Sequence, residues 1–263
     1  MAYVIRYCAG FQFKVGPRKI WNVQGASNLE ELRDRTAGLT LRRLKENVLD
    51  LPDKIITPVY LRLKSKVYEE VMGDYYNWYE KNPEESKSLT VQFTKLTKVR
   101  QIIADEKISQ TIEIAENIIE QDKKVIIFCN FTDSLNKITE HFGKAAVKLD
   151  GSMSKHERQF SVDQFQENDK VKVFVGNIKA AGVGITLTSA EAVIFNDLSF
   201  LPSDHAQAED RAYRYGQKNN VLVYYPIFEN TIEGIIYDIL HNKKQVIATV
   251  MGCLLYTSDA ADE

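Results

Sequence analysis

Cysteine is scarce in this sequence: only Cys8, Cys129 and Cys253 occur among 263 residues. The three lie far apart and form neither a Cys-x-x-Cys pair nor a cluster with any of the four histidines. This spacing argues against a disulfide framework and against a structural zinc site. It favours an intracellular setting, whether cytoplasm, nucleoid or nucleus, and it predicts no set of metal ligands.

Long apolar runs are missing as well. No stretch reaches the roughly 18 apolar residues that a membrane-spanning helix needs, and the first residues, MAYVIRYCAGFQFK, lack the apolar core of a signal peptide. We therefore expect neither export nor a membrane partner. The formal net charge is only −2, so the total charge does not point to a nucleic-acid partner. A composition of 44% hydrophobic and 27% charged residues is ordinary for a globular protein.

The two motifs with which P-loop ATPases hold a nucleotide are also absent. The pattern Gly-x-x-x-x-Gly-Lys-Ser/Thr does not occur, because the one Gly-Lys pair, Gly143 and Lys144, precedes Ala145 and lacks the upstream glycine. No apolar run ends in Asp-Glu-x-His or a close variant. We therefore do not expect this chain to contain the phosphate cradle or the carboxylate that holds Mg²⁺ in such enzymes.

The final residues, CLLYTSDAADE at 253–263, have no periodicity and no link to what precedes them. They resemble the translation of a sequencing adapter, and an ordinary disordered terminus is the alternative. We exclude them from the reasoning about the fold. The adapter interpretation implies that the reading frame was cut at this end, so the first residue could be internal too.

From residue 124 onward, the sequence contains a regular alternation of strand and helix patterns. Short apolar runs rich in β-branched residues predict strands at 124–130, 145–151, 171–177, 191–197 and 221–228. Helical patterns lie between them at 131–143, 154–168 and 203–216, and a long one follows at 232–250. This order predicts an α/β fold with a doubly wound parallel sheet, whose working loops lie at the carboxyl ends of the strands.

Helix ends and buried positions can also be predicted. Four polar residues are candidate N-caps: Thr132 or Asp133 for the first helix, and Ser203 or Asp204 for the third. Two glycines, Gly143 and Gly216, are expected to end these helices. In the helix between them, Phe160, Val162 and Phe165 are available for burial.

The region before residue 105 differs, since no alternation of strands and helices is visible there. Helices are expected at 64–79 and 89–104, on either side of the polar linker EKNPEESKS. Another helix is expected in ASNLEELRDR, with Ser27 or Asn28 as its cap. The rest of residues 1–57 is mixed in pattern and looks like part of something larger.

The segment QAEDRAYRYGQ, residues 207–217, combines two arginines with a helical pattern. Gln207, Arg211 and Arg214 are spaced i, i+4 and i+7, so on one helix they share a face. A guanidinium group can bond two phosphate oxygens at once. The alternative is a solvated helix in which Glu209 and Asp210 pair with the arginines, each pair contributing at most about 1 kcal/mol. Spacing alone favours this second interpretation.

A second face of the same helix is expected to pack on the sheet. Ala208, Ala212 and Tyr215 lie along it.

A glycine-containing loop precedes the arginines and favours the phosphate interpretation. In KAAGVGITLTSA, Gly182 and Gly184 allow a close backbone approach, and successive N–H groups can bind an anion. A tight turn is the alternative, because a lone Gly-x-Gly is a weak signal. The loop follows a predicted strand, as do the Asp-Gly pair at 150–151 and the NFT triplet at 130–132. We therefore expect all three loops at one edge of the sheet.

Four blocks of this sequence together resemble the Swi/Snf-like DNA translocases of helicase superfamily two. Three resemble motifs of the helicase C-terminal lobe: KVIIFCNFTDSL, LDGSMSKHERQFSVDQFQ and the stretch from KAAGVGITLTSA to RAYRYGQ. The fourth, LRRLKENVLDLPDK at 41–54, resembles the signature that joins the two motor lobes. With RYCAGFQFK and GASNLEELRD, the similarity is greatest to the annealing-helicase branch, and it covers most of residues 1–250.

The resemblance implies a RecA-like fold and a motor whose ATP lies between two lobes. It places Arg211 and Arg214 as arginine fingers at the γ-phosphate, with Gln207 and Asp210 beside the nucleotide. Gly182, Gly184 and the loop through Thr188 would couple the nucleotide to DNA. Four residues are candidates for contacting the DNA backbone: Ser152, Lys179, Thr186 and Thr188.

The resemblance also implies partners and a division of the chain. The partners would be duplex or branched DNA and a first RecA-like lobe, in cis or in trans, that binds most of the ATP with its Mg²⁺. Residues 1–57 would be the end of that first lobe with the joining segment, 58–104 a helical inter-lobe region, and 105–252 the second lobe. Alone, this chain is not expected to hydrolyse ATP.

Two departures from the family pattern and two rival interpretations accompany this reading. SFLP at 199–202 stands where a tryptophan before Asn-Pro is usual, and GIT at 184–186 stands where many members have asparagine third.

The first rival is a non-enzymatic nucleic-acid-binding module, for which the arginines would have no role. The second is another superfamily-two motor, such as an RNA helicase or a restriction-type translocase, against which the block at 41–54 argues.

Overall fold

The computed structural model describes residues 2–15, 17–23, 25–39, 45–85, 89–181 and 184–251. The chain divides into two compact units, Leu49–Asp238 and a smaller one formed by Met1–Val48 with Ile239–Glu263. Parts of the sequence predictions fall outside the described residues, among them Gly182, the adapter-like segment at 253–263, and residues 41–44 of the joining block.

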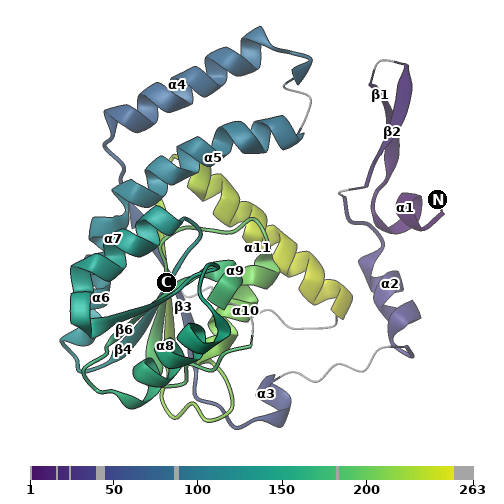
Figure 1. The fold of residues 1–263 in the computed structure, drawn as a ribbon. Coiled ribbons are helices and arrows are strands. Elements are labelled where there is room, and N and C mark those ends of the chain that lie inside the picture. Colours follow the sequence, from purple (N-terminus) through teal and green to yellow (C-terminus); the bar gives the residue numbers. More distant parts are fainter. Residues whose placement is uncertain are drawn as a thin grey trace, which may run out of the picture. The chain divides into compact units, whose positions relative to one another are not determined.

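The larger unit is built on a six-stranded parallel sheet (Figure 1). The strand order is β3-β8-β7-β4-β6-β5. The strands are β3 (Lys54–Leu61), β4 (Lys124–Cys129), β5 (Ala146–Leu149), β6 (Val173–Asn177), β7 (Ala190–Phe195) and β8 (Val221–Phe228). The five strands expected from the sequence are all present, and the doubly wound parallel sheet is confirmed.

The sixth strand, β3, was not predicted. It pairs in parallel with β8 over its whole length, from Lys54 opposite Val221 to Leu61 opposite Phe228. Pro58 lies in its middle, and proline is tolerated only in edge strands because it has no N–H to donate. β3 is such an edge strand, so it can accommodate the proline. It also runs across position 57, where the joining segment was expected to end.

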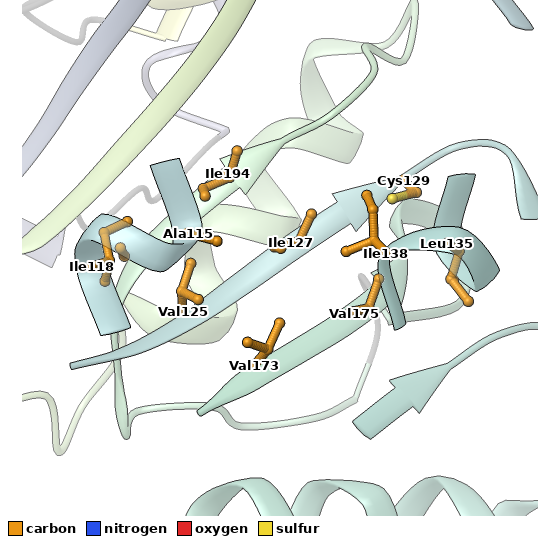
Figure 2. Packing of buried hydrophobic residues seen from close by; sticks show 11 residues of the cluster. Ala115, Ile118, Val125, Ile127, Cys129, Leu135, Ile138, Val173, Val175 and Ile194 are labelled. Atoms are coloured by element: carbon orange, nitrogen blue, oxygen red, sulfur yellow. The ribbon is translucent and has the colours of Figure 1, made fainter. Parts of the chain in front are cut away.

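Two helices cover one face of the sheet, and Figure 2 shows the apolar side chains beneath them. They are α6 (Ile108–Ile119), which the sequence analysis did not predict, and α7 (Thr132–Phe142). Alternate residues of β4 point to this side. The buried cluster consists of Ala115, Ile118, Val125, Ile127, Cys129, Leu135, Ile138, Val173, Val175, Ala192 and Ile194.

The opposite face is aromatic and carries α8 (Lys155–Glu167), α9 (Ile178–Ala181) and α10 (Pro202–Ala212). Phe195 lies between Phe128 and Tyr225, with ring centroids 5.5 and 4.7 Å away, and both pairs are stacked. Phe165 of α8 meets Phe174 of β6 edge to face at 5.5 Å. These rings hold the helix layer against the sheet.

The predictions for α8 were right in two of three positions. Val162 and Phe165 are buried as expected, whereas Phe160 is 59% exposed. The reason is geometric: residues 162 and 165 share a helix face, and residue 160 lies on another. Ser154 caps this helix, accepting a hydrogen bond from the backbone N–H of Glu157 in a full capping box.

The predicted cap of α7 was wrong. The helix begins at Thr132, so Phe131 occupies the N-cap and no side chain caps it. Gly143 ends the helix as expected, at a φ of 51° that favours glycine. The short 3₁₀ turn η2 (Gly143–Ala145) then leads into β5.

Two helices lie between β3 and α6 in the chain, α4 (Lys66–Lys81) and α5 (Leu89–Glu106), and both are close to the ranges predicted. Ser65 caps α4 by accepting from the N–H of Tyr68. Val99 and Ile103 of α5 form a small core with Phe228 at the end of β8. The chain continues after β8 into α11 (Ile232–Met251). No helix in the described ranges is long and apolar enough to cross a membrane.

The smaller unit contains α1 (Ala2–Tyr7), the antiparallel hairpin β1 (Phe11–Val15) and β2 (Arg18–Asn22), α2 (Leu29–Thr36) and α3 (Lys45–Val48). Asn28 stands at the N-cap of α2 but does not cap it; its side-chain amide donates to the carbonyl of Arg6 at 2.7 Å instead. Several large apolar side chains of this unit are exposed: Tyr3, Ile5, Phe11, Phe13, Ile20, Val23, Leu39 and Val48.

Candidate functional site

The arginine segment, residues 207–217, is only partly helical, and this corrects the predicted helix at 203–216. α10 begins at Pro202 with Leu201 at the N-cap, so neither Ser203 nor Asp204 caps it. It ends at Ala212. Beyond that point the backbone turns: the N–H of Arg214 donates to the carbonyl of Ala212 at 3.1 Å, and Gly216 has a φ of 97°. Arg214 therefore does not share a helix face with Gln207 and Arg211.

The packing face of this helix is likewise shorter than predicted. Ala208 and Ala212 are fully buried, as expected. Tyr215, which lies beyond the helix, is 80% exposed.

Hydrogen bonds tie both arginines to the loop before β7. Arg211 donates from Nη1 to the carbonyl of Ile185 at 3.1 Å and from Nε to the carbonyl of Gln207 at 2.9 Å. Arg214 donates from Nη1 to the hydroxyl of Thr186 at 3.2 Å. The carbonyl of Arg211 accepts from the N–H of Leu187 at 2.9 Å. The structure thus brings together the arginines and the loop that the sequence analysis selected.

The two guanidinium groups lie close enough to influence each other. Burial lowers the pKa of Arg211, and the positive charge of Arg214 lowers it further, while Asp210 opposes the shift. A pair of like charges at the rim of a loop attracts an anion, because an anion removes their repulsion. Arg214 is exposed and Arg211 is half-buried, so both can be reached from solvent.

Gln217 is a residue that the sequence analysis did not single out. Its side chain is buried, and Nε2 donates to the carbonyls of Thr188, Ala190 and Ala212 at 3.1, 2.8 and 3.2 Å. Its Oε1 accepts from the N–H groups of Lys218 and Asn219. This amide fastens the end of the arginine segment to the start of β7. A glutamine directly after a glycine in a turn was the only signal, and it is a weak one.

In the alternative interpretation Glu209 pairs with the arginines, but its side chain points into the protein and is 2% exposed. It forms an ion pair with Lys54 at 2.7 Å and accepts from the hydroxyl of Tyr225 at 2.7 Å. Its carboxylate is therefore engaged by Lys54 and Tyr225.

The loops do not all lie at one edge of the sheet, which corrects another expectation. In a parallel sheet all strands begin along one border of the sheet, here called the amino edge, and end along the opposite border, the carboxyl edge. Lys179 follows β6 directly and lies at the carboxyl edge, whereas Leu187 immediately precedes β7 and lies at the amino edge. The arginine segment precedes β8, so it also lies at the amino edge. The candidate loop therefore crosses from one edge to the other.

Two candidate DNA contacts remain at the carboxyl edge. Ser152 is exposed in the turn after β5, where its N–H and hydroxyl both donate to Asp150 at 2.8 and 2.5 Å. These hydrogen bonds from Ser152 lower the pKa of Asp150. Lys179 is exposed on α9, and its backbone N–H donates to the side chain of Asn177 at 3.1 Å.

The remaining candidate residues, in the loop before β7 and on α10, lie in different local environments. Gly184 is exposed with a φ of 77°, a conformation that favours glycine. Thr188 accepts from the side-chain amide of Gln166 on α8 at 3.3 Å, which ties the loop to that helix. Gln207 is exposed and Asp210 is half-buried on α10.

Asp197, at the end of β7, is a buried carboxylate that the sequence analysis did not select. Its Oδ1 accepts from the N–H of Asn130, and its Oδ2 has no hydrogen-bond partner among the described residues. Burial raises the pKa of Asp197 to about 6. Arg100 of α5 lies beside it, donates to the carbonyl of Leu198 and stacks over Phe200 at 4.3 Å. Phe200 thus fills, with another aromatic ring, the region where the family pattern has tryptophan.

Within the described ranges, no three His, Cys, Asp or Glu side chains are grouped as metal ligands. The groups that can act on a phosphate are the two guanidinium groups and the N–H groups of the loop beside them.

Comparison with known proteins agrees with the motifs. A family profile described as the helicase conserved C-terminal domain matches residues 106–216. The chain is 31% identical over 256 residues to the human "DNA annealing helicase and endonuclease ZRANB3", covering 95% of this chain and 24% of that protein. It is 33% identical over 265 residues to a Caenorhabditis elegans homolog of "SWI/SNF-related matrix-associated actin-dependent regulator of chromatin subfamily A-like protein 1", covering 94% of this chain and 36% of that protein.

Solved structures show the same similarity. The Sulfolobus solfataricus SWI2/SNF2 ATPase core in complex with double-stranded DNA is 31% identical, with a TM-score of 0.62 over 84% of this chain and 52% of that one. The C-terminal domain of the same ATPase is 27% identical, with a TM-score of 0.56 over 73% of this chain and 87% of that one.

The chain spans only 24% of the length of ZRANB3. The motifs, the parallel sheet and these similarities together identify it as carrying the RecA-like C-terminal helicase lobe of a Swi/Snf-like superfamily-two helicase.

Proposed function

We propose that this chain is the second motor lobe of an ATP-dependent DNA translocase. The first lobe, in cis or in trans, binds ATP with Mg²⁺, and this lobe closes on the nucleotide and on duplex or branched DNA. In the complete protein, ATP hydrolysis would open and close the two lobes and move them along the duplex. Residues 1–57 would be the end of the first lobe with the joining segment, 58–104 the inter-lobe helices, and 105–252 the second lobe.

The observation that carries this proposal is the pairing of Arg211 and Arg214 beside one loop. Arg211 is held by the carbonyls of Gln207 and Ile185, so its guanidinium is oriented before any ligand arrives. Arg214 is exposed and donates from Nη1 to a threonine hydroxyl, which a phosphate oxygen can replace. In this role Arg214 reaches the γ-phosphate and Arg211 supports it, while Gln207 and Asp210 line the nucleotide side of α10.

The loop from Gly182 to Thr188 would connect the nucleotide to DNA. Its described part ends against Arg211 at the amino edge, through the bond between the N–H of Leu187 and the carbonyl of Arg211, while Lys179 lies on α9 at the carboxyl edge. In this role the loop would carry a displacement from one edge to the other. Ser152 and Lys179 would contact the DNA backbone at the carboxyl edge, and Thr186 and Thr188 would lie within the connecting loop.

The related proteins support the choice of substrate. The human relative is named a DNA annealing helicase, and the archaeal ATPase core was solved with double-stranded DNA. We propose DNA for this chain on the same grounds.

The test is ATP hydrolysis by the full-length protein, with duplex DNA, single-stranded DNA, RNA or no nucleic acid. We expect duplex DNA to stimulate turnover most. Arg214→Ala should lose on the order of 10³-fold of that turnover, as expected of an arginine finger. Lys218→Ala is the control, because it removes an exposed cation next to the segment and no proposed contact. A loss of less than tenfold in Arg214→Ala would reject the finger assignment.

The same assay separates the rival functions. A non-enzymatic binding module would bind DNA equally well with and without ATP and would hydrolyse none. An RNA helicase would be stimulated by RNA more than by duplex DNA.

A further inference from the structure

Glu209 occupies a buried position two residues before Arg211, and Lys54 and Tyr225 bond its carboxylate. Its Oε2 accepts from Nζ of Lys54 at 2.7 Å, and its Oε1 accepts from the hydroxyl of Tyr225 at 2.7 Å. His205, one helical turn earlier, lies near the same tyrosine hydroxyl at 3.4 Å. A buried carboxylate is stable only when it is paired, so Glu209 holds α10 against the groups that satisfy it.

Lys54 is the first residue of β3, and its backbone is fixed where the arginine segment runs into β8. The N–H of Val221 donates to the carbonyl of Asp53 at 2.9 Å, and the N–H of Asp53 donates to the side chain of Asn220 at 3.0 Å. The Lys54 side chain also passes over the ring of Tyr213, 5.5 Å from its centroid. Lys54 therefore contacts the arginine segment on both sides of Arg211.

The electrostatics agree with a tight pair. Burial alone would lower the pKa of Lys54, but Glu209 beside it outweighs that effect, so the pKa is raised. The ammonium group is thus held in its charged form, next to the carboxylate that needs it.

We propose that Lys54 is a positioning residue for the arginines: its ion pair with Glu209 fastens the end of the lobe-joining segment, residues 41–54, to the helix that carries Arg211. The proposal rests on the proposed function of the arginines. Lys54 is fixed at the start of β3 and holds α10 and Tyr213 against it, and so sets where Arg211 and Arg214 stand. Lys54 and the arginine segment thereby act together, although 155 positions separate the two paired residues.

The same ion pair could serve only to stabilise the sheet edge, and a matched control separates the two roles. Lys172 is a lysine at the amino edge of the same sheet, paired with Asp122 at 2.7 Å. Its side chain is 19% exposed, close to the 25% of Lys54. It lies before β6, and its ammonium group donates to the carboxylate and the carbonyl of Asp122, which is not part of the arginine segment. The variants to compare are Lys54→Met, Glu209→Gln, the double variant and Lys172→Met.

The first measurement is amide hydrogen exchange on this chain, which needs no ATP and no first lobe. In Lys54→Met, the N–H groups of Arg214 and Gln217, which close the turn after α10, should exchange at least tenfold faster. Lys172→Met should leave them unchanged. Equal protection of these amides in Lys54→Met and in the wild type would overturn the proposal.

The second measurement is DNA-stimulated ATP turnover of the full-length protein. Lys54→Met and the double variant should each lose at least tenfold in the stimulated kcat, with the KM for ATP changed less. The double variant should recover the thermal midpoint that Lys54→Met loses, because neither partner is then left as an unpaired charge. If the stimulated kcat of the double variant recovers together with its thermal midpoint, the ion pair only stabilises the fold. That result would overturn the proposal.

Failure of the proposed function would look different. If the wild type shows no DNA-stimulated hydrolysis, the translocase assignment falls and the positioning role falls with it. If the wild type is stimulated and Lys54→Met is stimulated equally, only the positioning role falls.

Discussion

Arg214 donates a hydrogen bond to the hydroxyl of Thr186 across 28 positions of sequence, at 3.2 Å. The contact joins the turn after α10 to the loop before β7, and neither residue lies in a helix or strand. Both partners are accessible to solvent, so the bond can open when another acceptor arrives.

The first prediction concerns how unequally the two arginines contribute to stability. Arg211→Ala should lower the free energy of unfolding by about 1–2 kcal/mol, because it removes two side-chain hydrogen bonds to backbone carbonyls. Arg214→Ala should change it by less than about 0.5 kcal/mol, since its side chain is exposed and holds only a hydroxyl. Urea denaturation of this chain measures both, and equal losses would contradict the different anchoring of the two side chains.

The second prediction concerns the buried amide of Gln217. Gln217→Glu replaces a donor to three carbonyls with an oxygen that repels them, so we expect a loss of about 2–4 kcal/mol in the free energy of unfolding. Gln207→Glu is the control, because that side chain is exposed on α10 and should change stability by less than about 0.5 kcal/mol. Similar denaturation midpoints for the two variants would show that Gln217 does not brace the segment.

The third prediction uses the pH dependence of Asp197. Burial raises its pKa to about 6 in the folded protein, above the 3.8 of an exposed aspartate. The folded state therefore holds a proton that the unfolded chain has released, and this stability is lost as the pH rises from about 4 to 7. Asp197→Asn keeps the acceptor for the N–H of Asn130 and removes the titration.

The difference between the two proteins is the quantity to measure, because other titrating groups cancel in it. Relative to the wild type, Asp197→Asn should gain on the order of 2–3 kcal/mol between pH 4 and pH 7. Urea denaturation at several pH values gives this difference. A constant difference across the range would mean that Asp197 titrates at its ordinary pKa.

The fourth prediction compares two phenylalanines on α8. Phe165→Ala should cost about 3–5 kcal/mol in the free energy of unfolding, because its ring is fully buried against Phe174. Phe160→Ala should cost less than about 0.5 kcal/mol, since that ring is largely exposed. Thermal or urea unfolding of the two variants checks this prediction. A comparable loss of stability in Phe160→Ala would contradict the exposed position of that ring.

The local sequence pattern was sufficient to predict most strands of the sheet. The apolar runs that became β4, β6, β7 and β8 are fully or largely buried, and such runs are continuous in sequence, so their signal is local. β3 was not predicted, because its proline and its half-exposed position at the side of the sheet weaken that signal. The predicted N-caps of α7 and α10 were wrong for a related reason. Several polar residues near the start of a helix can cap it, and packing selects which residue is the first helical one.

The amino-acid sequence by itself determined the alternation of strands and helices, the glycines that end α7 and turn the backbone after α10, and the presence of two arginines beside a glycine-containing loop. Only the tertiary structure decided that Arg214 leaves the helix, that Glu209 turns inward to Lys54, and that Gln217 braces the turn. It also decided which edge of the sheet each loop occupies. Each of these depends on groups tens to more than a hundred positions apart, and a buried charge or amide takes its partner from whatever the fold brings within hydrogen-bond distance.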